Sequence, residues 1–200
     1  MFLKTNIFKA LIKKAWKGAG VTIFNTGEHW YICGYSWAAL IDKSVMPNKA
    51  LAALIELVGE MPAEGSGFKA GKNAPSQYEI KEVVELDLLK KVKEAEEEMD
   101  PTVVLVERDG KWCRLLQHPD TGKIKYINDV FIQIISRSEI DEEKEGEPVG
   151  PLWNPDEPYL MLWSNGLCVF GAYTLCDPEE GSEEAQITEN LKPIALPGKL

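Results

Sequence analysis

Long hydrophobic runs, histidines and paired cysteines are all scarce in this 200-residue sequence. No apolar run approaches the roughly 20 residues that a membrane-spanning helix needs. The N-terminal segment also lacks the unbroken apolar region and small-residue cleavage site of a signal peptide. We therefore expect a cytoplasmic protein with no membrane partner. The four cysteines form no C-x-x-C motif, so we expect them to be reduced, as is usual in that compartment.

Sequence signatures of catalysis, metal binding and cofactor binding are missing as well. The two histidines, His29 and His118, belong to no known nucleophile motif. His29 and Cys33 would point the same way on a strand, but a zinc site needs two further ligands. The glycines and lysines of residues 63–76 lack the G-x-x-x-x-G-K-[ST] order that binds nucleoside phosphates. We expect a protein that is not an enzyme and uses no metal or cofactor.

The composition that is present is typical of a globular protein, with 44% hydrophobic and 27% charged residues. The formal net charge is −10, which argues against a simple nucleic-acid coat protein. The charge leaves open a protein that turns one basic face to DNA. It also leaves open a protein that binds only other proteins.

Four segments repeat apolar residues at helical spacing and predict helices near residues 6–17, 48–60, 87–99 and 125–136. The last segment has the widest apolar stripe, formed by Tyr126, Ile127, Val130, Phe131, Ile134 and Ile135. Asn6, Asn48 and Asp87 are candidate N-caps for the other three helices.

Pairs of apolar runs flanking turn residues predict three β-hairpins, over residues 21–37, 102–117 and 159–175. Asp109-Gly110 and the Asn-Gly dipeptide at position 165 are strong turn signals because both favour hairpin tips. Residues 78–86 alternate as a further strand would.

The order helix, hairpin, helix occurs twice, and each element is separated from its counterpart by nearly the same number of residues. We therefore predict an α+β fold made of two repeated halves, residues 1–75 and 76–175. All helices are expected on one face of an antiparallel sheet. Residues 176–200 are acidic and contain prolines, so we expect them to form a poorly packed tail.

Three stretches, residues 1–32, 123–135 and 157–175, resemble parts of DNA sliding clamps, the processivity factors of replicative polymerases. The resemblance covers most of residues 1–175 and rests on patterns of hydrophobicity. It implies a DNA-clamp-like fold and a role as a replication accessory protein on double-stranded DNA. It also implies replication proteins or peptides as partners, and it allows a homo-oligomer.

Candidate DNA contacts are the lysines of the first and third predicted helices: Lys9, Lys13, Lys14, Lys17, Lys90 and Lys93. Lys9, Lys13 and Lys17 recur at one-turn spacing and would form one stripe. A lysine is a point charge on a flexible stem, which suits contact with phosphates without base recognition. The alternative interpretation is a solvated lysine face.

Trp153 lies beside prolines and an acidic loop and is a candidate partner-docking aromatic. The strand tryptophans Trp30, Trp112 and Trp163 are expected in the core or on a sheet face. If docking rather than DNA contact is the main role, the protein is a clamp-fold protein-interaction module that does not bind DNA. The net charge of −10 favours this rival function.

Overall fold

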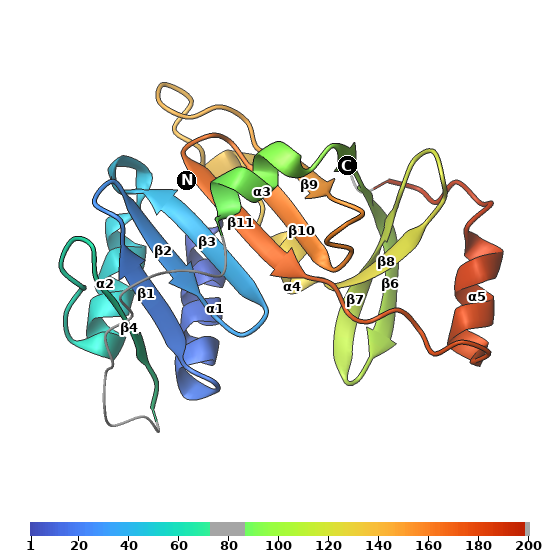
Figure 1. Ribbon diagram of the computed structural model, residues 1–200, viewed down its shortest axis with the longest axis horizontal. Helices are drawn as coiled ribbons and strands as arrows, with labels where there is room; N and C mark the ends of the chain where they lie inside the picture. The colour runs from blue at the N-terminus through green and yellow to red at the C-terminus, as the bar shows by residue number, and fades with distance from the viewer. Residues whose placement is uncertain (73–86, 199–200) are drawn as a thin grey trace.

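The computed structural model describes residues 1–72 and 87–198, which form one large and one small antiparallel sheet together with helices (Figure 1). The predicted α+β class is therefore confirmed. The predicted strand at 78–86 and the predicted boundary between residues 75 and 76 lie outside the described residues.

The large sheet has eight strands in the order β4-β1-β2-β3-β11-β10-β9-β5. Two three-stranded meanders meet at its centre, where β3 and β11 pair with Ala39 opposite Phe170. Its strands are β1 (Val21–Asn25), β2 (His29–Cys33), β3 (Trp37–Asp42), β4 (Gly67–Ala70), β5 (Glu97–Glu98), β9 (Val149–Trp153), β10 (Leu160–Ser164) and β11 (Cys168–Tyr173).

The small sheet has three strands in the order β6-β7-β8. Its strands are β6 (Asp100–Arg108), β7 (Lys111–Gln117) and β8 (Ile124–Asn128). The helices are α1 (Thr5–Lys17), α2 (Asn48–Val58), α3 (Leu88–Glu94), α4 (Val130–Gln133) and α5 (Glu183–Leu191). Two short 3₁₀ turns, Lys43–Val45 and Arg137–Glu139, complete the regular structure of the described ranges.

All three predicted hairpins form, as β1–β2, β6–β7 and β10–β11. Asp109 and Gly110 both have positive φ, 52° and 69°. Positive φ at both central positions gives the turn whose twist matches that of the flanking strands. The Asp-Gly signal therefore located the tip of the β6–β7 hairpin correctly.

Helix α1 confirms the first predicted helix, and its apolar stripe buries Phe8, Leu11 and Ile12. The helix begins at Thr5, so the predicted N-cap Asn6 lies inside the first turn and makes no capping bond. Helix α2 confirms the second prediction and ends at Gly59, whose φ of 89° suits a glycine.

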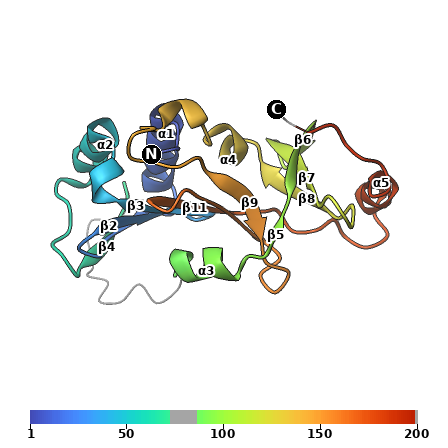
Figure 2. The same cartoon turned by 90° about the horizontal axis from the view of Figure 1, so that it is seen from above.

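The helices lie on both faces of the large sheet. Figure 2 shows α1, α2 and α4 on one side and α3 on the other. The prediction that all helices share one face is therefore wrong. The reason is visible in β10, where Met161 and Trp163 face the main core while Leu160 and Leu162 pack with Leu88 of α3. Both faces of the central strands are apolar, so each needs a covering layer.

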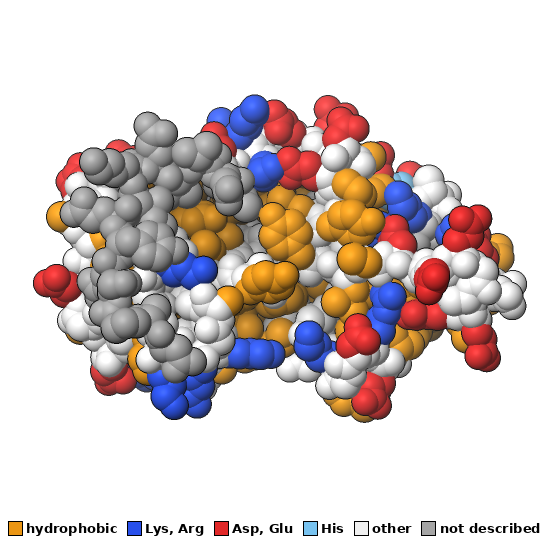
Figure 3. All heavy atoms as spheres, turned by 60° about the horizontal axis from the view of Figure 1, so that its bottom comes forward, with side chains coloured by type: hydrophobic (Ala, Val, Ile, Leu, Met, Phe, Trp, Pro, Cys, Tyr) orange, Lys and Arg blue, Asp and Glu red, His pale blue; other side chains and the backbone are white. Residues whose placement is uncertain are grey.

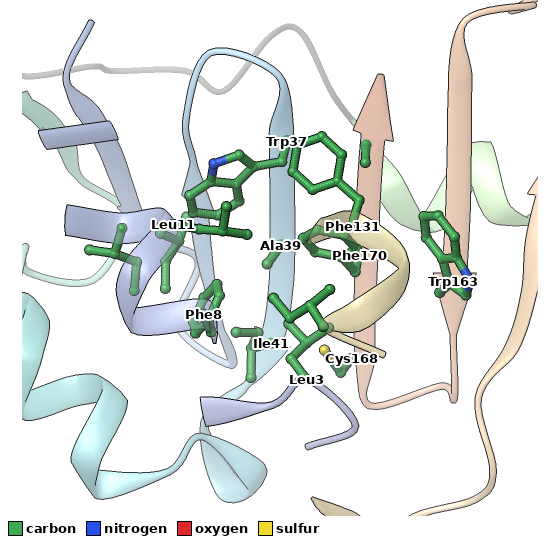
Figure 4. Close-up of a cluster of buried hydrophobic side chains, with 14 of the residues drawn as sticks. Leu3, Phe8, Leu11, Trp37, Ala39, Ile41, Phe131, Trp163, Cys168 and Phe170 are labelled. Atoms are coloured by element: carbon green, nitrogen blue, oxygen red, sulfur yellow. The ribbon is translucent and has the colours of Figure 1, made fainter. Parts of the chain in front are cut away.

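The main core lies between the large sheet and the helices α1, α2 and α4 (Figure 4). Aromatic rings form its centre. The ring centroids of Phe8 and Trp37 are 5.8 Å apart, those of Trp37 and Phe170 are 6.4 Å apart, and those of Phe131 and Phe170 are 6.1 Å apart. These contacts join α1 and α4 to the sheet centre.

The predicted helix over 125–136 is wrong, because residues 124–128 form strand β8 and only Val130–Gln133 are α-helical. Strand β8 is buried on both faces. Tyr126 packs in the core of the small sheet, whereas Ile127 packs in the main core. A strand buried on both sides has a continuous apolar run, which periodicity cannot distinguish from a buried helix.

Helix α3 is shorter than the predicted helix over 87–99 and ends at Glu94. Because the helix ends at Glu94, Lys91 and Lys93 lie in its last turn, where positive charge suits the helix dipole. Asp87 does act as the predicted N-cap, and its carboxylate accepts a hydrogen bond from the Lys90 amide at 3.0 Å. Glu97–Glu98 form edge strand β5 instead of further helix.

The described residues give no evidence of clamp-like repeats. The hairpins that were matched, β1–β2 and β6–β7, lie in different sheets. The large sheet also takes strands from both predicted halves, since β9, β10 and β11 continue the sheet that β1, β2 and β3 begin.

Most of residues 176–198, the predicted poorly packed tail, are exposed, but they include helix α5 and contact the small sheet at several points. Ser182 caps α5 by accepting a hydrogen bond from the Ala185 amide at 3.1 Å. Thr188 is buried, and its hydroxyl lies 2.6 Å from the Tyr126 hydroxyl. Gln117 adds hydrogen bonds to the backbone around residue 195. The tail thus completes the core of the small sheet.

Candidate functional site

The lysines of α1 form an exposed group that is not neutralised by neighbours. Lys13, Lys14 and Lys17 are exposed and Lys9 is half-buried. None of the four takes part in an ion pair with another described residue. Their charges are therefore available to an anionic partner.

The lysines of α3 lie elsewhere. Lys90 and Lys93 are on the opposite face of the large sheet from α1 (Figure 2). Lys90 also lies 3.5 Å from Glu94, one turn further along the helix. The structure therefore brings the four α1 lysines together and separates them from the two α3 lysines.

Three adjoining hollows of about 370, 480 and 440 Å³ lie between α1 and the β6–β7 hairpin. Lys111 and Asn128 line all three hollows. Figure 3 brings this side of the molecule forward and shows an indentation at its lower edge, with Lys and Arg side chains on both sides. We call this feature the Lys111 groove, which is lined by Lys14, Tyr35, Lys111, Trp112, Asn128 and Tyr173 above a floor of Val130 and Phe131.

Exposed aromatic rings border the Lys111 groove. The side chain of Tyr35 is 89% exposed in the turn between β2 and β3, and that of Trp112 is 61% exposed on β7. Tyr159 and Tyr173, at the other end of the groove, are each 42% exposed. Large exposed aromatics at one place indicate a binding surface more often than scattered single residues do.

The walls of the Lys111 groove are positively charged. Asp129 is the one acidic residue among the described residues that line it. Its carboxylate is buried, lies 2.5 Å from Nε of Arg114 and accepts a hydrogen bond from Gln133. Because Arg114 compensates Asp129, the net charge of the walls comes from Lys14 and Lys111. A protein of net charge −10 thus has one cationic groove.

Trp153 is not the exposed docking residue that its sequence context suggested. Its side chain is 3% exposed because β9 lies between β10 and β5 in the sheet. The ammonium of Lys123 lies 4.5 Å from its ring centre and the ring of His118 lies 6.0 Å away. The acidic loop that precedes Trp153 therefore leads directly into a buried strand.

The exposed tryptophan is instead Trp112, which the sequence analysis expected in the core or on a sheet face. It does lie on a sheet face, but nothing in the described structure covers that face. Its position two residues after the Asp109-Gly110 turn is the signal that could have identified it, because hairpin tips tend to protrude into solvent. Tyr35, in the turn between two other strands, has the same signal and was also missed.

The described residues contain no group of three or more His, Cys, Asp or Glu side chains arranged to hold a metal ion. The four cysteines are free, and burial raises the pKa of the Cys33, Cys113 and Cys168 thiols above the usual value. A raised pKa makes a thiol a poor nucleophile near neutral pH. In the same ranges, none of the helices has the length and apolar character to cross a membrane.

Comparison with known proteins gives no family assignment, because no protein-family model matches the chain and no curated protein matches it significantly. The resemblance to sliding clamps stays a prediction. The function must therefore be argued from the α1 lysines and the Lys111 groove.

Proposed function

We propose that the protein is a non-enzymatic, DNA-associated accessory protein that contacts the nucleic-acid backbone through the lysines of α1. The observation that supports this proposal most is the group of lysines Lys9, Lys13, Lys14 and Lys17, which is without ion pairs among the described residues. In a protein with ten excess negative charges, an uncompensated cationic helix favours an anionic partner.

The spacing of these lysines suits an extended polyanion. Lys9, Lys13 and Lys17 are separated by one turn each, so their Cα atoms span about 12 Å along the helix. Contacts of this kind fix a phosphate backbone in position without recognising base sequence. Lys90 and Lys93 do not belong to this surface because the large sheet separates them from α1. Replication as the biological setting comes only from the resemblance to sliding clamps.

The proposal is tested by the salt dependence of duplex DNA binding. The triple variant Lys9→Glu, Lys13→Glu, Lys17→Glu should bind more weakly, and the slope of log affinity against log salt should flatten by up to about 3 units. Each lost phosphate contact removes one released counterion. Fluorescence anisotropy with a labelled duplex measures both effects.

A matched control changes the same net charge elsewhere. Lys49→Glu, Lys90→Glu, Lys93→Glu alters three exposed lysines on α2 and α3 and should leave the slope close to that of the wild type. Equal losses in both triple variants would mean that only net charge matters. A wild type that binds no DNA at low ionic strength would contradict the proposal.

A second candidate function is a protein-interaction module that does not bind DNA. The β6–β7 hairpin favours it, because Leu105 and Trp112 are 42% and 61% exposed and lie on one face of the hairpin. Val103, 52% exposed, lies on the same strand as Leu105. Exposed apolar side chains of this kind are typical of docking surfaces. Leu105→Ala, which adds no charge beside Lys14, should leave duplex binding unchanged under the first proposal and weaken partner binding under the second.

A further inference from the structure

We propose that the Lys111 groove binds a single-stranded nucleic acid, with bases stacked on Tyr35 and Trp112 and phosphates held by Lys14 and Lys111. This inference rests on the proposed function, since it assumes that the protein binds nucleic acid. It adds the form of the nucleic acid and the place where that form is recognised.

Two exposed aromatic rings favour contact with the bases of a nucleic acid. Tyr35 and Trp112 line adjoining hollows of the groove, one in the β2–β3 turn and the other on β7, and both are mostly exposed. Single-strand binding proteins stack bases on such rings, and every base offers a flat face for this contact. The bases of a duplex are already stacked on one another, so exposed rings favour an unpaired strand.

Two lysines of the groove favour contact with phosphates. Lys14 and Lys111 lie in the walls of adjoining hollows and form no ion pair with another described residue. Arg114 neutralises Asp129 within the same walls. Glu107 pairs directly opposite Trp112 in the β6–β7 hairpin, but neither Glu107 nor Asp109 lines the hollows. Among the residues that line the groove, Lys14 and Lys111 are therefore the charges that are free to meet phosphates.

The continuous shape of the groove suits an extended strand. The three hollows share Lys111 and Asn128, so they form a continuous path from Trp112 past Tyr35 to Tyr173. Val130 donates its amide to Oδ1 of Asn128 at 3.2 Å, and the NH₂ group of Asn128 has no hydrogen-bond partner among the described residues. This NH₂ group is suited to an acceptor on a base edge. An acidic peptide would meet the lysines but offers no planar ring at each step to stack.

The experiment measures binding of labelled dT₁₂ and U₁₂ oligomers and of a 12-base-pair duplex to the full chain by fluorescence anisotropy. Both single strands should bind more tightly than the duplex, and a preference between dT₁₂ and U₁₂ tells whether DNA or RNA suits the groove. Tyr35→Ala and Trp112→Ala should each lower single-strand affinity by about tenfold and leave duplex affinity within about twofold.

Matched variants separate stacking from simple apolar contact. Trp112→Phe keeps an aromatic face and should retain most of the affinity, whereas Trp112→Leu keeps only apolar area and should lose it. Leu89→Ala, on the opposite face of the large sheet, is the control for a lost exposed apolar side chain. Circular dichroism spectra of all variants should match that of the wild type, because the altered side chains are exposed.

Each possible result of these binding experiments either supports or overturns the inference. Equal binding by Trp112→Leu and wild type would overturn the stacking mechanism, as would displacement of dT₁₂ by a poly-glutamate peptide of equal charge. Duplex binding that depends on the α1 lysines, with no effect of Tyr35→Ala or Trp112→Ala on either single strand, would overturn this inference and leave the proposed function standing. No binding of any nucleic acid at low salt would overturn both.

Discussion

Phe131 is a single residue with two structural roles. Its ring packs 6.1 Å from that of Phe170 in the main core, and the same residue forms part of the floor of the Lys111 groove. Its side chain is 4% exposed. We expect Phe131→Ala to lower the free energy of unfolding by about 3–5 kcal/mol, since it removes a buried ring and leaves a cavity.

Urea denaturation followed by tryptophan fluorescence measures this loss. Tyr35→Ala serves as the control, because an exposed side chain should change stability by less than about 0.5 kcal/mol. A loss below about 1 kcal/mol for Phe131→Ala would mean that α4 is not anchored in the core as described.

Cys168 gives a pH-dependent prediction. Burial raises the pKa of its thiol, so the folded state keeps the proton at pH values where the unfolded thiol, with a pKa of about 8.5, loses it. Above that pH the unfolded state binds fewer protons than the folded state, and stability falls as pH rises. The contribution of Cys168 to stability is thus complete below about pH 8.5 and declines above it.

Cys168→Ala should remove the part of the slope that comes from Cys168, while Cys33 and Cys113, whose pKa is also raised, keep theirs. In urea titrations between pH 7 and pH 10, the stability difference between wild type and variant should shrink as pH rises, by up to about 1.4 kcal/mol per pH unit. A constant difference across this range would contradict the prediction. In the folded wild type, the exposed Cys176 should react with a thiol reagent before the buried Cys168.

Three tryptophans show what the sequence can predict for a single residue. Trp163 is buried, as expected for a residue inside a continuously apolar strand. The predicted exposures of Trp153 and Trp112 are reversed, since Trp153 is buried and Trp112 is exposed. Exposure depends on what covers a strand and not on the strand's own residues. Strand β9 is flanked by β5 and β10, whereas the tip of β7 is paired with β6 and extends past the end of β8.

Helix α5 shows at the element scale how the tail is attached. The Tyr126 hydroxyl donates to Oγ1 of Thr188, which itself donates to the Glu184 carbonyl at 2.7 Å. Thr188→Val should leave the buried Tyr126 hydroxyl without its partner and lower stability by about 1–3 kcal/mol. Hydrogen exchange should then increase first in α5.

A double-mutant cycle checks that the hydrogen bond is responsible. Tyr126→Phe combined with Thr188→Val should cost less than the sum of the two single variants, because neither polar group is then left alone. Additive losses would indicate that α5 is held by other contacts, such as Leu191 and the ion pair between Arg108 and Glu184.

Elements with their own local signals could be predicted from the sequence. Helix α1 has a narrow apolar stripe with a lysine face, and the hairpins have Gly-containing turns. Strand β8 and helix α3 were not predicted correctly, because tertiary packing decides both. Strand β8 is apolar on two sides since it separates two cores, and α3 covers a second face of the sheet that local pattern does not reveal.

The oligomeric state is a prediction for the whole molecule. The large sheet ends in β4, with four residues, and in β5, with two. Such short edge strands offer little backbone for pairing between copies. We expect a monomer of 22.4 kDa in light scattering. A dimer or trimer that persists on dilution would contradict this expectation and favour the homo-oligomer that the clamp resemblance allows.

The arrangement of the whole chain was the least predictable from sequence. The fold class followed from counting helices and hairpins, but the pairing of β3 with β11 joins segments that share no local pattern. The Lys111 groove was missed for the same reason. Its residues come from α1, the β2–β3 turn, β7 and β11, which only the fold brings together.

The β3–β11 pair also sets the order in which the chain can assemble during synthesis. Residues 37–42 leave the ribosome long before their hydrogen-bonding partners at 168–172 are made. Until then the first meander has an open β3 edge in what becomes the centre of the sheet, and such edges are prone to aggregate. Contacts between distant segments also slow folding. The nascent chain should therefore depend on chaperones until nearly all of its strands have been translated.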